Sequence, residues 1–152
     1  MRMITVPTEE LMEVIRLQLE QGGKANMSVT GSSMLPMLRE HLDSVILAPC
    51  EGTLKSGDVA LYRTEDGKYI LHRIIRVTDT RYLFCGDNQA VPETVSKDRV
   101  LAVVTAYTKK GKLYHLNDLR YCIYRMLMVK CFGIRKYYIA LRRRIGSYRR
   151  GR

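Results

Sequence analysis

The sequence predicts a mainly β protein with one helix at each end of the chain. Three observations indicate this fold class. Between residues 25 and 116, short runs rich in β-branched and aromatic residues alternate with turn-forming residues. On either side of this region, apolar residues recur at the spacing of an α-helix. The chain has 152 residues, of which 46% are hydrophobic, which is enough for one domain with a substantial core.

The first predicted helix spans residues 8–21 and ends at the pair Gly22-Gly23. Its apolar side chains fall on one face at helical spacing: Leu11, Val14, Ile15 and Leu19. We therefore assign residues 1–24 to an N-terminal helical segment.

Residues 25–116 form the predicted antiparallel β domain. The strongest signal is a hairpin, in which GDVALYR and YILHRIIRV are joined through Asp66-Gly67. After it, the segment KKGK turns the chain near the end of the domain. Further strands are predicted from β-rich runs at residues 28–31, 44–49, 81–87 and 98–108.

Residues 117–152 form a basic tail. Fourteen of the 26 Lys and Arg residues follow Tyr107, together with a single acid, Asp118, although the net charge of the whole chain is +11. Residues 119–144 are predicted to form an amphipathic helix, with a kink expected near Gly133. Its apolar arc includes Ile123, Met126, Leu127, Ile134 and Leu141, and its basic side includes Arg120, Arg125, Arg135, Lys136, Arg142 and Arg143. Such a charge excess indicates a phosphate-bearing partner, either an anionic membrane surface or nucleic acid.

Several classes of protein are disfavoured by the composition. The first apolar stretch is interrupted by acidic residues, so no signal peptide is expected. No window of about 18 uninterrupted apolar residues predicts a membrane span, so a cytoplasmic or peripheral membrane location is expected. No metal or cofactor is predicted, because the four cysteines form no C-x-x-C pair: Cys50, Cys85, Cys122 and Cys131.

The stretch GSSMLPML, residues 31–38, is the first candidate for chemistry. Two serines lie between Gly31 and an apolar run that Pro36 interrupts, which suits neither a surface loop nor a core strand. A serine becomes a nucleophile only with a base in hydrogen-bond reach. Of the three histidines, His72 lies in the second hairpin strand, where alternation places it on the same face as Ile70 and Ile74.

Five segments in order resemble a known family: GSSMLP, GDVALYR, LHRIIRV, CGDNQ and KDRVLAVV. They are similar to the successive boxes of the signal peptidase I and SOS-repressor superfamily of serine peptidases, over residues 28–106. The resemblance implies a peptidase domain of coiled antiparallel β-strands. It also implies that Ser33, directly before Met34, is the nucleophile. The activity that the resemblance implies is cleavage of a peptide or protein substrate after a small residue.

The resemblance further implies which residue is the base. His72 stands where endoplasmic-reticulum-type signal peptidases have His, whereas bacterial signal peptidases and SOS-type repressors have Lys. A neutral imidazole accepts a proton near pH 7 without a large pKa depression. An acid should orient it; Asp87 in CGDNQ is the first choice, Asp98 the second and Glu93 a distant third.

Gly31 stands where signal peptidases often have a Ser whose hydroxyl assists the oxyanion hole. We therefore expect the backbone N–H of Ser33 to be the main oxyanion donor. Met34, Leu35 and Pro36 are expected to anchor the loop in apolar surroundings.

Three other readings remain open at this level. A self-cleaving regulator is disfavoured, because the 32 residues before Ser33 hold no helix-turn-helix. An inactive peptidase-like module could bind membrane or nucleic acid through the tail, where tyrosines lie among the arginines and could stack on bases. The tail could instead simply pack its apolar arc on the β domain.

Overall fold

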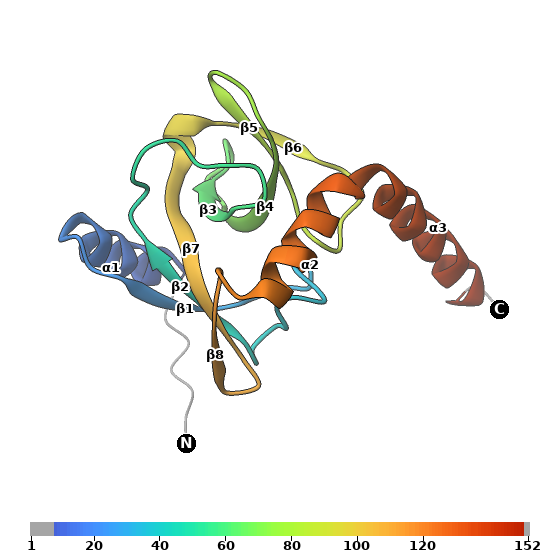
Figure 1. The fold of residues 1–152 in the computed structure, drawn as a ribbon, viewed down its shortest axis with the longest axis horizontal. Helices are drawn as coiled ribbons and strands as arrows, with labels where there is room; N and C mark the ends of the chain where they lie inside the picture. The colour runs from blue at the N-terminus through green and yellow to red at the C-terminus, as the bar shows by residue number, and fades with distance from the viewer. Residues whose placement is uncertain (1–7, 151–152) are drawn as a thin grey trace.

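The computed structural model describes residues 8–150 and confirms a mainly β fold with helices at both ends of the chain (Figure 1). The ends of the predicted terminal segments, residues 1–7 and 151–152, lie outside the described residues. In chain order the elements are α1 (Thr8–Glu20), β1 (Ala25–Ser28), β2 (Ser44–Ala48), β3 (Val59–Arg63), β4 (Tyr69–Val77), β5 (Arg81–Cys85), β6 (Glu93–Ser96), η1 (Lys97–Arg99), β7 (Val100–Lys109), β8 (Lys112–His115), α2 (Leu119–Lys130) and α3 (Phe132–Arg150).

The eight strands of the described region form one open antiparallel sheet in the order β1-β2-β7-β3-β4-β5-β6, and β8 pairs with β7. The predicted hairpin is confirmed as β3 and β4, which pair with Ala60 opposite His72. Register shifts interrupt the β2–β7, β3–β7 and β4–β5 pairs. Such bulges bend strands and increase their twist.

The predicted strand at residues 28–31 is wrong, because Ser28 is the last residue of β1. After it, the amide of Val29 donates to the carbonyl of Asp43, and Gly31 turns the chain with a φ of 78°. The short strands β6 and β8 were not predicted. Each has four residues and is assigned by pairing with a neighbour, which local sequence patterns do not encode.

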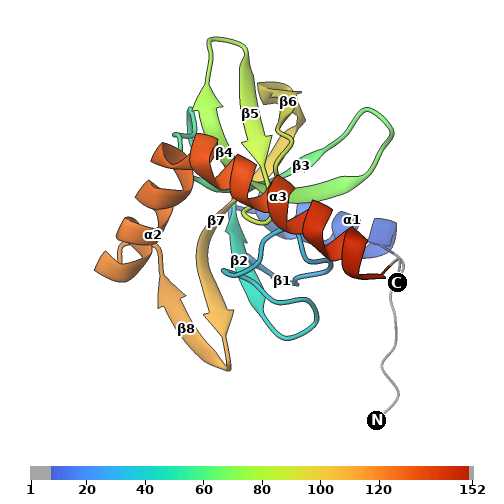
Figure 2. The same cartoon turned by 90° about the vertical axis from the view of Figure 1, so that its right-hand side faces the viewer.

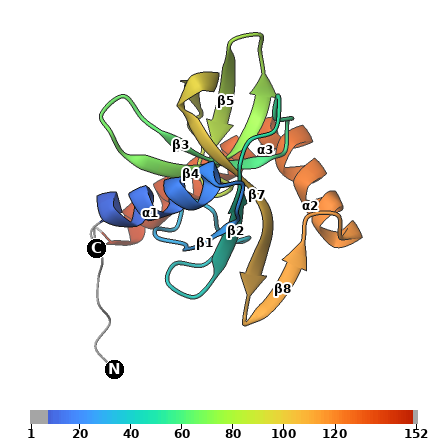
Figure 3. The same cartoon turned by 90° about the vertical axis from the view of Figure 1, so that its left-hand side faces the viewer.

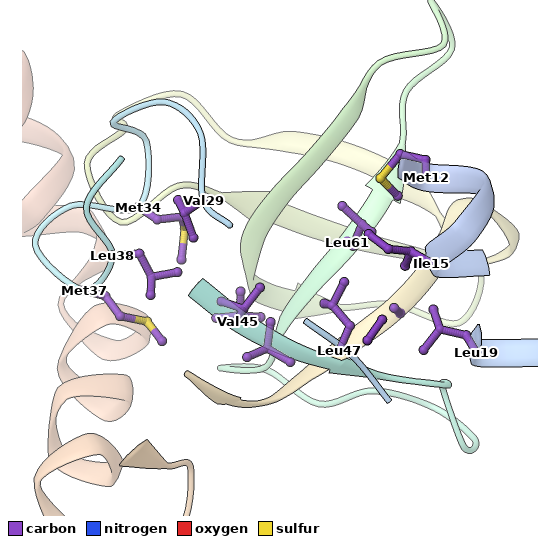
Figure 4. Packing of buried hydrophobic residues seen from close by; sticks show 14 of the residues in the cluster. Met12, Ile15, Leu19, Val29, Met34, Met37, Leu38, Val45, Leu47 and Leu61 are labelled. Atoms are coloured by element: carbon purple, nitrogen blue, oxygen red, sulfur yellow. The ribbon is translucent and has the colours of Figure 1, made fainter. Parts of the chain in front are cut away.

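The larger apolar cluster extends from α1 to the loop of residues 31–38 (Figure 4). On α1 the buried side chains are Met12, Ile15 and Leu19, whereas Leu11 and Val14 are exposed. The predicted apolar face is therefore correct for Ile15 and Leu19 and wrong for the other two residues. Met12 is buried instead of Leu11 and Val14. The helix therefore has two overlapping apolar faces, and only one of them packs on the sheet.

The C-terminal helices lie on the opposite side of the molecule from α1, as the two side views show (Figure 2, Figure 3). The single helix predicted over residues 119–144 is wrong, because α2 ends at Lys130 and α3 begins at Phe132. The break at Cys131 lies two residues before the expected kink, and Cys131 has φ −92° and ψ 17°. Within residues 8–150, no helix is both long and apolar enough to cross a bilayer.

The side chain of Tyr121 joins α2 to the larger apolar cluster, and its ring lies 5.8 Å from that of Tyr107. Its hydroxyl also accepts a hydrogen bond from Arg73. The start of the tail is therefore part of the core, but through Tyr121 and not through the predicted apolar arc. Most of the predicted apolar arc, by contrast, faces solvent: Ile123, Met126, Leu127, Ile134 and Leu141 are exposed.

We expect Tyr121→Ala to lower the free energy of unfolding by about 3 kcal/mol, because the change leaves a cavity and an unpaired donor in the core. Tyr137→Ala is the matched control on α3 and should change stability by less than about 0.5 kcal/mol. The wild-type residues are 3% and 77% exposed, respectively. Urea denaturation measures both variants; equal losses would contradict the packing of α2 on the sheet.

Candidate active site

Ser33 lies in the loop between β1 and β2, and this loop is anchored by three buried apolar side chains. These are Met34, Met37 and Leu38, which Figure 4 shows together at the end of the cluster away from Leu19 of α1. The expectation that Leu35 and Pro36 anchor the loop is wrong, because Leu35 is only half-buried and Pro36 is exposed.

The loop begins at Gly31. This position requires glycine, because its φ of 78° is a conformation that residues with a side chain rarely adopt. No atom outside its immediate neighbours lies within 4 Å of the position that a Cβ would occupy. The chain is therefore open to solvent two residues before Ser33.

The turn at residues 85–89 holds the serine loop from the other side. The amide of Asn88 donates to the carbonyl of Ser33 at 2.8 Å, and its side chain donates to the carbonyl of Ser32 at 3.2 Å. A Cβ on Gly86 would lie 2.6 Å from the carbonyl oxygen of Ser33. Glycine is therefore required at position 86 for this turn to support the backbone of Ser33.

His72 is a buried residue of β4 that remains neutral at physiological pH. Its Nδ1 lies 3.2 Å from the hydroxyl of Tyr62. Within residues 8–150, no protein group hydrogen-bonds Nε2, and this atom is not fully buried. Burial lowers the pKa of His72 to about 4, although the negative charge of Asp87 acts in the opposite direction. The imidazole is therefore in the state that a general base requires.

Ser33 and His72 line the same cavity, which has a volume of about 340 Å³ and also contacts Gln89. No hydrogen bond joins their side chains in the described part of the chain. Catalytic hydrogen bonds are often long without substrate and tighten in the complex. The sequence-predicted nucleophile and base therefore share one site.

Two free strand edges face this cavity. Among the described strands β1 pairs only with β2, and Met27 and Ser28 of β1 line the cavity. β4 pairs with β5 only from Arg73 onward, which leaves residues 69–72 unpaired on that side. Because free edges present unpaired N–H and C=O groups, an extended peptide can add to either edge.

The sequence predicted that Asp87 orients His72, but Asp87 does not hydrogen-bond this histidine. Its two carboxylate oxygens accept hydrogen bonds from Arg73, one from Nε at 2.8 Å and the other from Nη2 at 2.9 Å. One of them also accepts from the hydroxyl of Tyr124 at 2.7 Å. The side chains of Arg73 and Asp87 are both fully buried. Burial lowers the pKa of Arg73, but the hydrogen bond and charge of Asp87 more than offset this and raise it. Asp87 is therefore held in an ion pair next to His72.

Of the other predicted acids, Asp98 is exposed in η1 and does not line the cavity. Glu93, the third choice, accepts a hydrogen bond of 2.8 Å from Tyr62, whose oxygen also contacts His72. The two remaining histidines, His41 and His115, are exposed and lie outside the cavity.

Sequence reasoning missed Arg73 and Tyr62. A signal for Arg73 was present, because an arginine between apolar residues of a central strand is almost never buried without a partner. Alternation placed Arg73 on the opposite face of β4 from His72, but did not indicate that both faces of this strand are buried. No sequence signal identified Tyr62, because its partners lie on other strands.

Within residues 8–150, no three side chains of His, Cys, Asp or Glu gather as potential metal ligands. No family model, curated protein or solved structure matches this chain.

The buried neutral histidine makes stability depend on pH. As the pH falls from 7 toward 4, the unfolded chain gains a proton at its ordinary His pKa of 6.5, whereas folded His72 gains one only near 4. The wild type should therefore lose about 3 kcal/mol more unfolding free energy over this range than His72→Gln does. Urea denaturation at several pH values measures the difference, and parallel losses in both proteins would contradict it.

Proposed function

We propose that the protein is a serine endopeptidase of the signal-peptidase type, with Ser33 as nucleophile and His72 as general base. The observation that carries this proposal is the shared cavity, which a loop serine, a neutral buried histidine and residues of two free strand edges all line. The open antiparallel sheet is consistent with the mainly β fold that the sequence resemblance implies.

In the acylation step, Ser33 Oγ attacks the carbonyl carbon of the scissile peptide bond while its proton passes to His72 Nε2. The negative charge then develops on the carbonyl oxygen. In the described residues no group accepts from the amide of Ser33, so this N–H is available as the oxyanion donor. His72 next gives its proton to the leaving amine, and water hydrolyses the acyl-enzyme with His72 again as base.

The substrate is proposed to be an extended peptide that forms strand-like hydrogen bonds beside β1 and residues 69–72 of β4. A second cavity of about 670 Å³ adjoins the site and shares Met12, Leu61 and Tyr69 with it. It lies against α1 and has room for larger side chains of the same peptide. The preference for a small residue before the cleaved bond rests on the resemblance alone.

Asp87 contributes to the proposed mechanism without touching the reacting atoms. With Arg73 it holds the turn that supports Ser33, and its charge favours the protonated form of His72. Asp98 makes no contact that supports the catalytic role expected from the sequence.

We expect Ser33→Ala to reduce peptide cleavage by at least about 10³-fold, because the nucleophile is removed. Ser32→Ala is the matched control; this exposed side chain is one residue away and should retain most activity. Incubation with a peptide library, followed by mass spectrometry of the products, measures both variants. If the two variants cleave equally, or if the wild type cleaves nothing, Ser33 is not a peptidase nucleophile.

We further propose that the exposed face of α2 and α3 binds an anionic membrane surface. The helices display exposed apolar side chains beside exposed basic ones, among them Arg120, Lys136 and Arg142, a combination typical of interfacial helices. Arg135 does not contribute as predicted, because its guanidinium donates to the carbonyls of Gly86 and Asp87. Nucleic-acid binding is less well supported, because Tyr121 and Tyr124 pack inward, which leaves Tyr137 and Tyr138 as the exposed tyrosines among the described side chains of the two helices.

We expect Ile134→Ser to weaken binding to anionic liposomes, whereas Val91→Ser should leave it unchanged. Both wild-type side chains are 76% exposed, so neither change should unfold the protein, but Val91 lies in the loop before β6. Flotation with anionic vesicles measures binding, and added salt should weaken it, since each basic residue contributes about 1 kcal/mol. If the wild type does not bind anionic vesicles at low salt, this surface has another role.

A further inference from the structure

Two polar side chains, Tyr62 and Glu93, form a hydrogen-bonded chain that begins at His72. The Nδ1 of His72 lies 3.2 Å from the hydroxyl of Tyr62, and this hydroxyl donates to Oε2 of Glu93 at 2.8 Å. The sheet brings these residues together from different strands. Ala60 pairs with His72, which places Tyr62 diagonally beside it, and Glu93 pairs with Phe84 on β5.

The direction of the hydrogen bonds determines the tautomer of the imidazole. An ionised carboxylate only accepts, so the hydroxyl proton of Tyr62 points to Glu93. The phenol oxygen is then left with its lone pairs for His72, and only an Nδ1–H can donate to them. The Nε2 of His72 consequently carries a lone pair, and this is the nitrogen with no protein partner in the described chain.

Tyr62 is held rigidly enough to serve this purpose. Its side chain is fully buried and stacks on Phe84, with ring centroids 4.3 Å apart. Burial, together with the hydrogen bond and charge of Glu93, raises the pKa of Tyr62. The phenol therefore keeps its proton and remains a neutral bridge between histidine and carboxylate.

Asp87, the first-choice orienting acid from the sequence, does not hydrogen-bond the ring of His72. Both of its oxygens accept from Arg73, and one also accepts from Tyr124. The hydrogen bonds of its carboxylate are therefore made to Arg73 and Tyr124 and not to the imidazole. A hydrogen-bonded partner for the imidazolium must therefore come from the Tyr62 side of the ring.

We propose that Tyr62 and Glu93 are positioning residues for His72, holding it as the Nδ1–H tautomer and stabilising its protonated form through the bridging hydroxyl. This inference rests on the proposed peptidase function for its catalytic consequence. When the proton of Ser33 reaches Nε2, the imidazolium donates from Nδ1 to Tyr62, and the dipole of its O–H bond points to the Glu93 carboxylate. Neither Tyr62 nor Glu93 gives up or gains a proton in the cycle.

A purely structural role for Tyr62 is the rival explanation, because its ring belongs to the second apolar cluster. Tyr82→Phe separates the two. Tyr82 is a buried residue of the same cluster, and its hydroxyl accepts a hydrogen bond of 3.0 Å from the amide of Leu54. Both Tyr→Phe variants therefore remove a buried hydroxyl together with the hydrogen bonding of that hydroxyl. Only Tyr62→Phe removes the partner of His72.

The experiment combines nitrogen NMR of the His72 ring with peptidase kinetics on the full chain. The ring signals are identified by their loss in His72→Gln. We expect the Nδ1–H tautomer in the wild type and in Tyr82→Phe, and a rise of the Nε2–H tautomer in Tyr62→Phe. Tyr62→Phe should also lower kcat about 10²-fold with little change in KM, the lower end of a general-base contribution. Glu93→Gln, which keeps an acceptor but removes the charge, should preserve the tautomer and lower kcat.

An Nε2–H tautomer in the wild type would overturn the inference, as would an unchanged tautomer and unchanged kcat in Tyr62→Phe. Equal effects of Tyr62→Phe and Tyr82→Phe would also overturn it and assign Tyr62 a structural role. If the wild type cleaves no peptide, the proposed function fails, yet the tautomer measurement still decides whether Tyr62 and Glu93 position His72. The two failures are therefore distinguishable.

Discussion

The buried ion pair between Arg73 and Asp87 is the interaction on which the rest of the site depends. The guanidinium also donates to the carbonyl of Gly57, to the hydroxyl of Tyr121 and to the sulfur of Met37. It thereby joins β4, the turn after β5, the serine loop and α2 at one point. Breaking such a buried pair costs about 3–5 kcal/mol, because the remaining charge has no partner. The ion pair therefore keeps the loop of Ser33 and the strand of His72 in a single arrangement.

The same ion pair determines how the two acids near His72 divide their roles. Asp87 is committed to Arg73, so it acts on His72 through its charge and through the backbone that it supports. Glu93 lies on the other side of the ring and reaches it through Tyr62. Burial keeps the imidazole neutral and makes its protonated form costly, and the negative charge of Asp87 reduces that cost.

The C-terminal helices have two faces with different roles. The inward face completes the ion-pair network through Tyr121 and Tyr124, and it covers the turn at residues 85–89 through Arg135. The outward face carries exposed apolar and basic side chains. A partner bound to the outward face would therefore lie on helices that directly contact the turn supporting Ser33. The tail and the candidate active site are parts of one packed unit.

The sequence alone determined the features that depend on neighbouring residues. Alternation predicted β3 and β4, Asp66-Gly67 predicted the turn between them, and helical spacing located α1. Ordered motifs identified Ser33 and His72, which the structure places at one cavity. Only the tertiary structure decided which groups surround His72. The pairing of Phe84 with Glu93, and the docking of α2 against Arg73, join residues far apart in the chain. Local periodicity specifies the direction of a side chain relative to its own strand, but its partner depends on the register between strands and on packing across the sheet.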